Sequence, residues 1–347
     1  MADGGPAEGD VGGAGRAREA GGALGAAEAG VDGMRVPPPD SSTATPPDAA
    51  TDASTGPAAA AVEPPVVWVD GRLHAGGGAV VDALDHGMTT GDGVFETCKV
   101  VDGVPFALGL HLERLARSAA GLGLPAPDPA RVREAVGAVL AERPLARGRL
   151  RVTWTSGPGP LGSERHGGST LVVAAAPAPA RAAAPSVVLV PWTRNEGAAT
   201  AGLKTTSYAE NVVALRRALA AGAGEALLAN TRGELCEGTG SNVVVQLRDD
   251  RGAPAPELVT PPLSSGCLAG VTRALLLRWA SEEGLPLVER PIPVEALEGA
   301  AAVLLTSSLR DVQVQTALDG RPLATGGLPA RAAELFARRA AEDVDPT

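Results

Sequence analysis

The 347-residue chain has few of the residues on which metal sites, disulfide frameworks and nucleic-acid interfaces depend. Its three cysteines and four histidines show no ligand spacing, so we expect no metal site. An odd number of cysteines without a secretory signal favours the cytoplasm. Prolines and an arginine interrupt the longest apolar region, residues 170–192, which predicts two strands and a loop rather than a membrane span.

No basic cluster stands out in a chain whose formal net charge is −10, so we expect no nucleic-acid partner. Most of that charge comes from residues 1–65, which carry ten acidic residues against three arginines and no aromatic residue. Such a segment buries too little apolar surface to offset its ordering entropy. We therefore predict a disordered acidic tail, rich in Ala, Gly and Pro, over residues 1–65.

The remaining chain alternates helical and strand patterns without a regular βαβ rhythm, which predicts an α+β fold in two lobes. Pro-Ala repeats at 176–185 indicate a linker between a small α/β domain, residues 66–180, and a larger one, residues 186–343. Strands are expected at 66–72, 79–83, 94–101, 149–155, 170–175, 187–191, 225–229, 242–247 and 302–306, and helices at 108–122, 128–142, 209–220 and 271–283. The first of these strands is expected to close in an Asp-Gly turn at Asp70-Gly71.

Lysine is scarce: only Lys99 and Lys204 occur among 30 basic residues. A chain that uses arginine for its surface cations retains a lysine where an amine must lose its proton and act as a nucleophile. A chance surface position is the alternative interpretation of either lysine. For Lys204, the surrounding sequence favours the interpretation as a reactive lysine.

Several short motifs accompany Lys204 in order along the chain. Residues 201–211 read AGLKTTSYAEN, and residues 237–242 read EGTGSN. Upstream, residues 111–115 read HLERL, and downstream lie TPPLSSGCLAGVTR at 260–273 and LTSSLRDV at 305–312. Together these motifs resemble those of the fold-type IV pyridoxal-phosphate enzymes, the class IV aminotransferase family. The resemblance covers essentially the whole core and none of the tail.

The resemblance implies pyridoxal 5′-phosphate as the cofactor and a role for each matching residue. Lys204 would bind the cofactor covalently, and Glu237 would face the pyridine nitrogen and keep it protonated. The phosphate would be bound by the Arg114 guanidinium and by backbone amides at the start of the helix after Gly270. The expected cofactor-binding residues are Lys204, Arg114, Glu237, Val271, Thr272, Ser308 and Tyr208, with Thr97 and the loop at 156–159 as expected substrate contacts.

Within the family, the core most resembles 4-amino-4-deoxychorismate lyase, which makes 4-aminobenzoate and pyruvate for folate biosynthesis. Glu210, six residues after Lys204, and GDGVFET at 91–97 favour this assignment. Tyr208 follows Lys204 by four residues, whereas branched-chain transaminases place a tyrosine five residues after the lysine. Ser207 replaces an asparagine of the lyases.

Two other functions remain open from the sequence. One is an aminotransferase for branched-chain L-amino acids or D-amino acids, in which Lys204 would transfer a proton between the substrate and the cofactor. The other is a binding protein without activity, which the intact motifs disfavour. The resemblance also implies a homodimer that acts on a small molecule, with its site near the lobe boundary.

Overall fold

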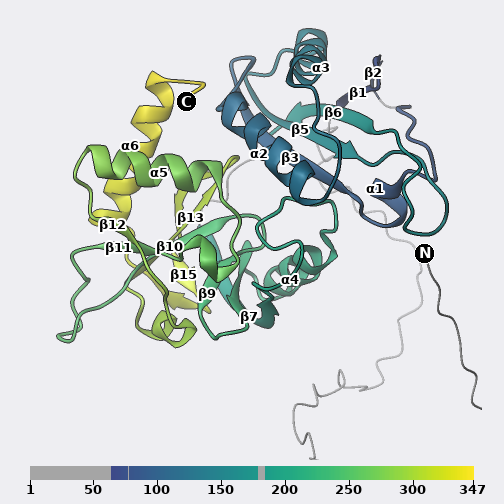
Figure 1. The fold of residues 1–347 in the computed structure, drawn as a ribbon. Helices are drawn as coiled ribbons and strands as arrows, with labels where there is room; N and C mark the ends of the chain where they lie inside the picture. Colours follow the sequence, from purple (N-terminus) through teal and green to yellow (C-terminus); the bar gives the residue numbers. More distant parts are fainter. Residues whose placement is uncertain (1–63, 77, 179–183) are drawn as a thin grey trace, which may run out of the picture. The chain divides into compact units, whose positions relative to one another are not determined.

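The computed structural model describes residues 64–76, 78–178 and 184–347, all within one compact unit, Ala59–Thr347. The predicted tail, apart from its last two residues, lies outside the described residues, as does the middle of the predicted linker. The fold is α+β, as predicted: one sheet is formed before residue 178 and two sheets after residue 185 (Figure 1). The domain boundaries at 180 and 186 stay a prediction.

The first sheet has six strands in the order β2-β1-β6-β5-β3-β4. All neighbouring strands of this sheet pair antiparallel, and β3 pairs with β5 along its whole length, with Phe95 opposite Thr153 and Thr97 opposite Arg151. The elements of this part are β1 (Val66–Val69), β2 (Arg72–Ala75), α1 (His86–Thr89), β3 (Gly93–Val101), β4 (Val104–Pro105), α2 (Leu108–Gly121), α3 (Pro129–Glu142), β5 (Arg147–Thr155) and β6 (Thr170–Pro177).

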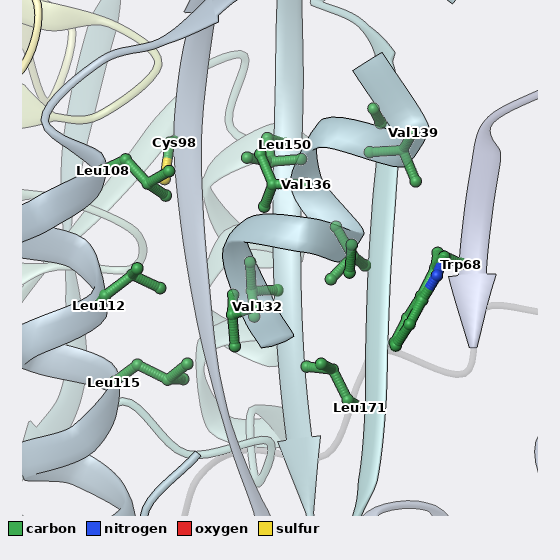
Figure 2. Close-up of a cluster of buried hydrophobic side chains, with 14 of the residues drawn as sticks. Trp68, Cys98, Leu108, Leu112, Leu115, Val132, Val136, Val139, Leu150 and Leu171 are labelled. Carbon is green, nitrogen blue, oxygen red and sulfur yellow. The ribbon is translucent and has the colours of Figure 1, made fainter. Parts of the chain in front are cut away.

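Helices α2 and α3 pack on one face of this sheet and bury a continuous apolar core (Figure 2). Leu108, Leu112 and Leu115 recur at helical spacing on α2, and strand β5 alternates buried and exposed residues along most of its length. Since alternate residues of a strand point to opposite faces, Arg149 and Arg151 project from the face that the helices leave uncovered.

The second part of the chain forms two five-stranded sheets, β12-β11-β10-β13-β14 and β16-β15-β7-β8-β9. Helix α4 packs against β7 and β8, while α5 and α6 pack on each other through Trp279 and Phe336, whose ring centroids are 5.1 Å apart. The elements are β7 (Ser186–Arg194), α4 (Ala209–Ala220), β8 (Glu225–Asn230), β9 (Leu235–Gly238), β10 (Asn242–Gln246), β11 (Leu258–Thr260), η1 (Leu263–Ser265), α5 (Val271–Glu282), β12 (Leu287–Glu289), η2 (Val294–Gly299), β13 (Ala302–Ser307), β14 (Asp311–Val314), β15 (Ala317–Leu318), β16 (Arg321–Pro322) and α6 (Leu328–Glu342).

One prediction of secondary structure is wrong. Residues 79–83 form no strand: Val80 is 76% exposed, and the segment pairs with no sheet. The turn expected at Asp70-Gly71 is confirmed: the strand ends at Val69, Asp70 adopts a left-handed conformation (φ 42°), and the chain returns as β2. Among the described residues, no helix is both long enough and apolar enough to span a membrane.

Candidate active site

The eight predicted site residues come from two strands, from three helices or their starts, and from two loops, and they line one cavity of about 970 Å³. They are Lys204, Arg114, Glu237, Val271, Thr272, Ser308, Tyr208 and Thr97. The structure therefore brings them together, while the role of each stays a prediction. Residues 156–159 are not among those that line this cavity, and the expected substrate contact of this loop stays a prediction.

Lys204 lies in the loop between β7 and α4. Its segment is held by β3: the Lys204 carbonyl accepts from the Phe95 amide at 3.0 Å, and Thr205 bridges Val94. The amine lies 4.3 Å from the centroid of the Phe95 ring and 5.7 Å from that of Tyr208. Burial, and then the nearby Arg114 cation, lower the pKa of Lys204 to about 8. The amine is thus poised to act as a nucleophile and as a base.

Glu237 lines the cavity from strand β9. Its Oε2 accepts from the Leu268 amide at 2.9 Å, and its Oε1 lies 3.3 Å from Nε of Arg194. Burial raises the pKa of Glu237, while Arg194, the Leu268 amide and Lys204 oppose that rise. Arg194, the last residue of β7, also pairs with Glu210 at 2.7 Å. Glu210 therefore reaches Glu237 only indirectly, through the guanidinium of Arg194.

Helix α5 points its N-terminus into the cavity beside Ser308 and Arg114. No side chain caps this helix at Gly270, so its first amides are free to bind an anion. A Cβ at Gly270 would lie 1.9 Å from Oδ1 of Asn242, and the Nδ2 of this asparagine donates to the Leu268 carbonyl at 2.8 Å. The start of the helix is therefore fixed at a separation that only glycine permits.

Arg114 is held by a buried carboxylate that the sequence did not single out. Glu96 accepts from Nε and from an Nη of Arg114 at 2.7 and 2.6 Å, and from Nδ1 of His111 at 2.6 Å. Burial would raise the pKa of Glu96, but Arg114 and His111 lower it to about 2. The other ring nitrogen of His111 lies 3.4 Å from Oγ of Ser308. The network fixes the guanidinium and the hydroxyl at the anion end of the cavity.

Tyr208 and Thr97 complete the walls. The Tyr208 ring packs edge-on against Phe95, with centroids 5.3 Å apart, and its hydroxyl donates to the Thr239 carbonyl at 3.2 Å. Burial, followed by the charge of Glu237, raises the pKa of Tyr208 to about 12. Thr97 stands on β3 directly opposite Arg151.

This donor set fits a phosphorylated pyridine aldehyde. The amine of Lys204 can bind the aldehyde, the carboxylate of Glu237 can meet the ring nitrogen, and the uncapped α5 amides with Ser308 and Arg114 can bind the phosphate. Nowhere among the described residues do three or more histidine, cysteine or acidic side chains gather as they would around a metal ion.

The family model described as amino-transferase class IV matches residues 93–316. This match spans every motif around the cavity. The chain belongs to the class IV aminotransferases. The predictions of the family, of the fold and of pyridoxal phosphate as the cofactor are therefore confirmed.

Known proteins of this class IV family resemble the chain over most of their length. A bifunctional aminodeoxychorismate lyase / D-amino acid transaminase of Mycobacterium tuberculosis is 34% identical over 281 residues, covering 74% of this chain and 92% of the relative. A D-alanine aminotransferase of Bacillus licheniformis is 28% identical, covering 75% and 90%. The pyridoxal-phosphate-bound structure of a hypothetical aminotransferase from Mycobacterium tuberculosis is 31% identical, with a TM-score of 0.70 and coverage of 81% and 100%.

In this class IV aminotransferase the sequence motifs did not single out the basic wall of the cavity. Arg149 and Arg151 project from β5 into it, and the Arg151 guanidinium lies 3.8 Å from the centroid of the Phe95 ring. The signal that could have found them is the alternation along β5, where arginines repeat at every second position from Arg147. Such a repeat is more common on the solvent-exposed face of a strand, so by itself it does not indicate a binding site.

Proposed function

We propose that this pyridoxal-phosphate enzyme is a 4-amino-4-deoxychorismate lyase that produces 4-aminobenzoate and pyruvate. The observation that carries the proposal is the pair of guanidinium groups on β5, Arg149 and Arg151, which line the same cavity as Lys204; besides burial, the charge of Arg151 contributes to the lowered pKa of the Lys204 amine. Among the described residues, no carboxylate pairs with either group. The proposed substrate has an amine and a carboxylate on its ring and a second carboxylate on the enolpyruvyl group, which suits a cavity with an amine-reactive lysine and two guanidinium groups without carboxylate partners.

The position of Arg151 fits a planar substrate. Its guanidinium covers the Phe95 ring, and Thr97 lies across from it on β3. A carboxylate bound to Arg151 would hold the substrate ring near Phe95 and its amine toward Lys204, whose amine lies 4.3 Å from the same aromatic ring.

The residues of the cavity divide the proposed reaction between them. When bound, the cofactor supplies an electron-withdrawing ring that stabilises negative charge on the carbon bearing the substrate amine. Lys204, with a pKa lowered to about 8, removes the proton from C4 as general base. The enolpyruvyl oxygen then leaves C3, which makes the ring aromatic, and protonation of the departing enol gives pyruvate. Glu237, whose Oε1 lies 3.3 Å from Nε of Arg194, would meet the ring nitrogen of the cofactor and favour its protonated form.

The relatives support this proposal and one alternative. The relative that is 34% identical carries both aminodeoxychorismate lyase and D-amino acid transaminase in its name. An aminotransferase would use the same Lys204 to move a proton between the substrate carbon and the cofactor, and Arg151 would bind an acidic amino or keto acid. The D-alanine aminotransferase among the relatives favours this second candidate.

As part of the same proposal, the enzyme works as a homodimer in the cytoplasm. All three cysteines are buried free thiols, which suits a reducing compartment.

The test is to supply 4-amino-4-deoxychorismate to the cofactor-loaded enzyme and to follow 4-aminobenzoate and pyruvate together. We expect equal amounts of both products. Conversion of the cofactor to its amine form by D-alanine, without 4-aminobenzoate from the ring substrate, would instead establish the aminotransferase.

Arg151→Gln tests the basis of the proposal. We expect KM for the ring substrate to rise by about tenfold to a hundredfold with a much smaller change in kcat, because a charge-assisted hydrogen bond is lost. Arg147→Gln is the matched control, since Arg147 stands on the same strand outside the cavity. Equal KM values for the two variants would contradict the role given to Arg151.

A further inference from the structure

Glu225 is a buried carboxylate for which the reaction described above has no use. It is the first residue of β8, is 3% exposed, and is followed by an apolar run. Taking a carboxylate out of water is costly unless a cation and hydrogen-bond donors compensate for it. Its partners therefore indicate what the residue does.

One oxygen of Glu225 holds the turn between β9 and β10. Its Oε1 accepts from Oγ1 of Thr239 and from the Gly240 amide, both at 2.7 Å, and lies 3.3 Å from Oγ of Ser241. A Cβ at Gly238 would lie 2.9 Å from the same oxygen, so the turn is drawn tightly onto the carboxylate. This turn directly follows Glu237, the residue that would meet the ring nitrogen of the cofactor.

The other oxygen of Glu225 pairs with the guanidinium of Arg310. Arg310 belongs to the turn after β13 that also contains Ser308, and its Nε donates to Oγ of Ser307 at 3.3 Å. The same turn is fixed from the first sheet, because Asp311 binds Nζ of Lys99 at 2.6 Å. Glu225 thus connects the ring-nitrogen end of the cavity with its phosphate end.

A third segment depends on the same carboxylate through Thr239. While its hydroxyl donates to Glu225, its carbonyl accepts from the hydroxyl of Tyr208, four residues after Lys204. The segments carrying Lys204, Glu237 and Ser308 therefore meet at one buried charge.

We propose that Glu225 is a positioning residue of the cofactor site, which holds the turn at 239–241 and, through Arg310, the turn at 307–310 in the arrangement that binds pyridoxal phosphate. The proposal rests on the cofactor site and is independent of whether the enzyme is a lyase or an aminotransferase. It explains why a costly buried carboxylate stands where the rest of the strand is mostly apolar.

The experiment compares Glu225→Gln with the wild-type enzyme in two measurements on the full chain. Cofactor affinity is measured by titrating cofactor-free protein with pyridoxal phosphate and following the visible absorption of the bound form. Thermal unfolding of the cofactor-free protein is measured in parallel. We expect the Kd to rise by about tenfold or more, because the amide cannot hold the Arg310 cation and both neighbouring turns at once.

The matched control is Glu257→Gln, which removes a partly exposed ion pair with Arg290 outside the cavity and should leave the Kd unchanged. A residue with a merely structural role would lower the unfolding temperature and leave the Kd of the folded protein unchanged, and that result would overturn the proposal. If Glu225→Gln does not fold, Thr239→Val removes a single donor to the carboxylate. A higher Kd for pyridoxal phosphate in that variant supports the proposal, and an unchanged Kd overturns it.

Discussion

The lowered pKa of Lys204 predicts that the stability of the cofactor-free protein depends on pH in an unusual direction. A lysine that gains an acidic partner on folding stabilises the folded state below its pKa. Lys204 is instead affected first by burial and then by Arg114, so folding disfavours its charged form. Replacing it by methionine, which is of similar length and uncharged, removes this effect.

The size of the effect follows from proton linkage. The pKa falls from 10.5 to about 8, so between these values the unfolded chain binds a proton that the folded chain does not. Stability then rises with pH by about 1.4 kcal/mol per pH unit, or about 3 kcal/mol across the whole window. Below pH 8 both states are protonated, and Lys204 contributes a constant penalty. The difference in unfolding free energy, wild type minus Lys204→Met, should therefore increase by about 2 kcal/mol between pH 8 and pH 9.5.

The assay is urea unfolding of both cofactor-free proteins at a series of pH values from 7 to 9.5. Groups that titrate in both proteins cancel in the difference, and the pKa of Tyr208, raised to about 12, lies above this range. A difference that stays constant from pH 8 to 9.5, or that decreases, would refute the assignment of a lowered pKa to Lys204.

Two further predictions concern the anion end of the cavity. Glu96→Gln leaves the buried Arg114 cation without a carboxylate and should lower the free energy of unfolding by about 3–5 kcal/mol in urea titrations. Because the pKa of Glu96 falls from 4.5 to about 2 on folding, its contribution is complete above pH 4.5 and should be lost as the pH falls toward 2. Gly270→Ala places a Cβ against Asn242 and should weaken pyridoxal-phosphate binding by about tenfold, measured by spectral titration. Gly299→Ala, where a Cβ meets nothing within 4 Å, should leave that affinity unchanged.

Much of the fold follows from local sequence patterns. The expected helix at 209–220 is α4 without a change at either end, and the expected helix at 108–122 differs from α2 by one residue. Their apolar residues recur at helical spacing, which the sequence displays directly. The run at 79–83 has an equally apolar pattern, and only the absence of a neighbouring strand shows that it is a loop.

The same distinction applies to the site. Lys204, Glu237 and Arg114 stand in motifs that can be recognised within a few residues, and all of them line the cavity. Their partners come from distant parts of the chain: Glu96 precedes Arg114 by 18 residues, and Arg310 follows Glu225 by 85. A sequence pattern contains no record of such a pairing, because it is the packing of sheets and helices that creates it.

The acidic partners also separate two kinds of arginine around the cavity. Arg114, Arg194 and Arg310 each pair with a carboxylate, so their charges are largely neutralised and they fix the geometry of the cofactor site. By contrast, Arg149 and Arg151 have no carboxylate partner among the described residues. A free guanidinium beside a reactive amine gains most from an anionic ligand, since no internal ion pair must first be broken. We therefore propose that the paired arginines shape the cofactor site, whereas the unpaired ones bind the substrate, for which only the folded structure suggests a location.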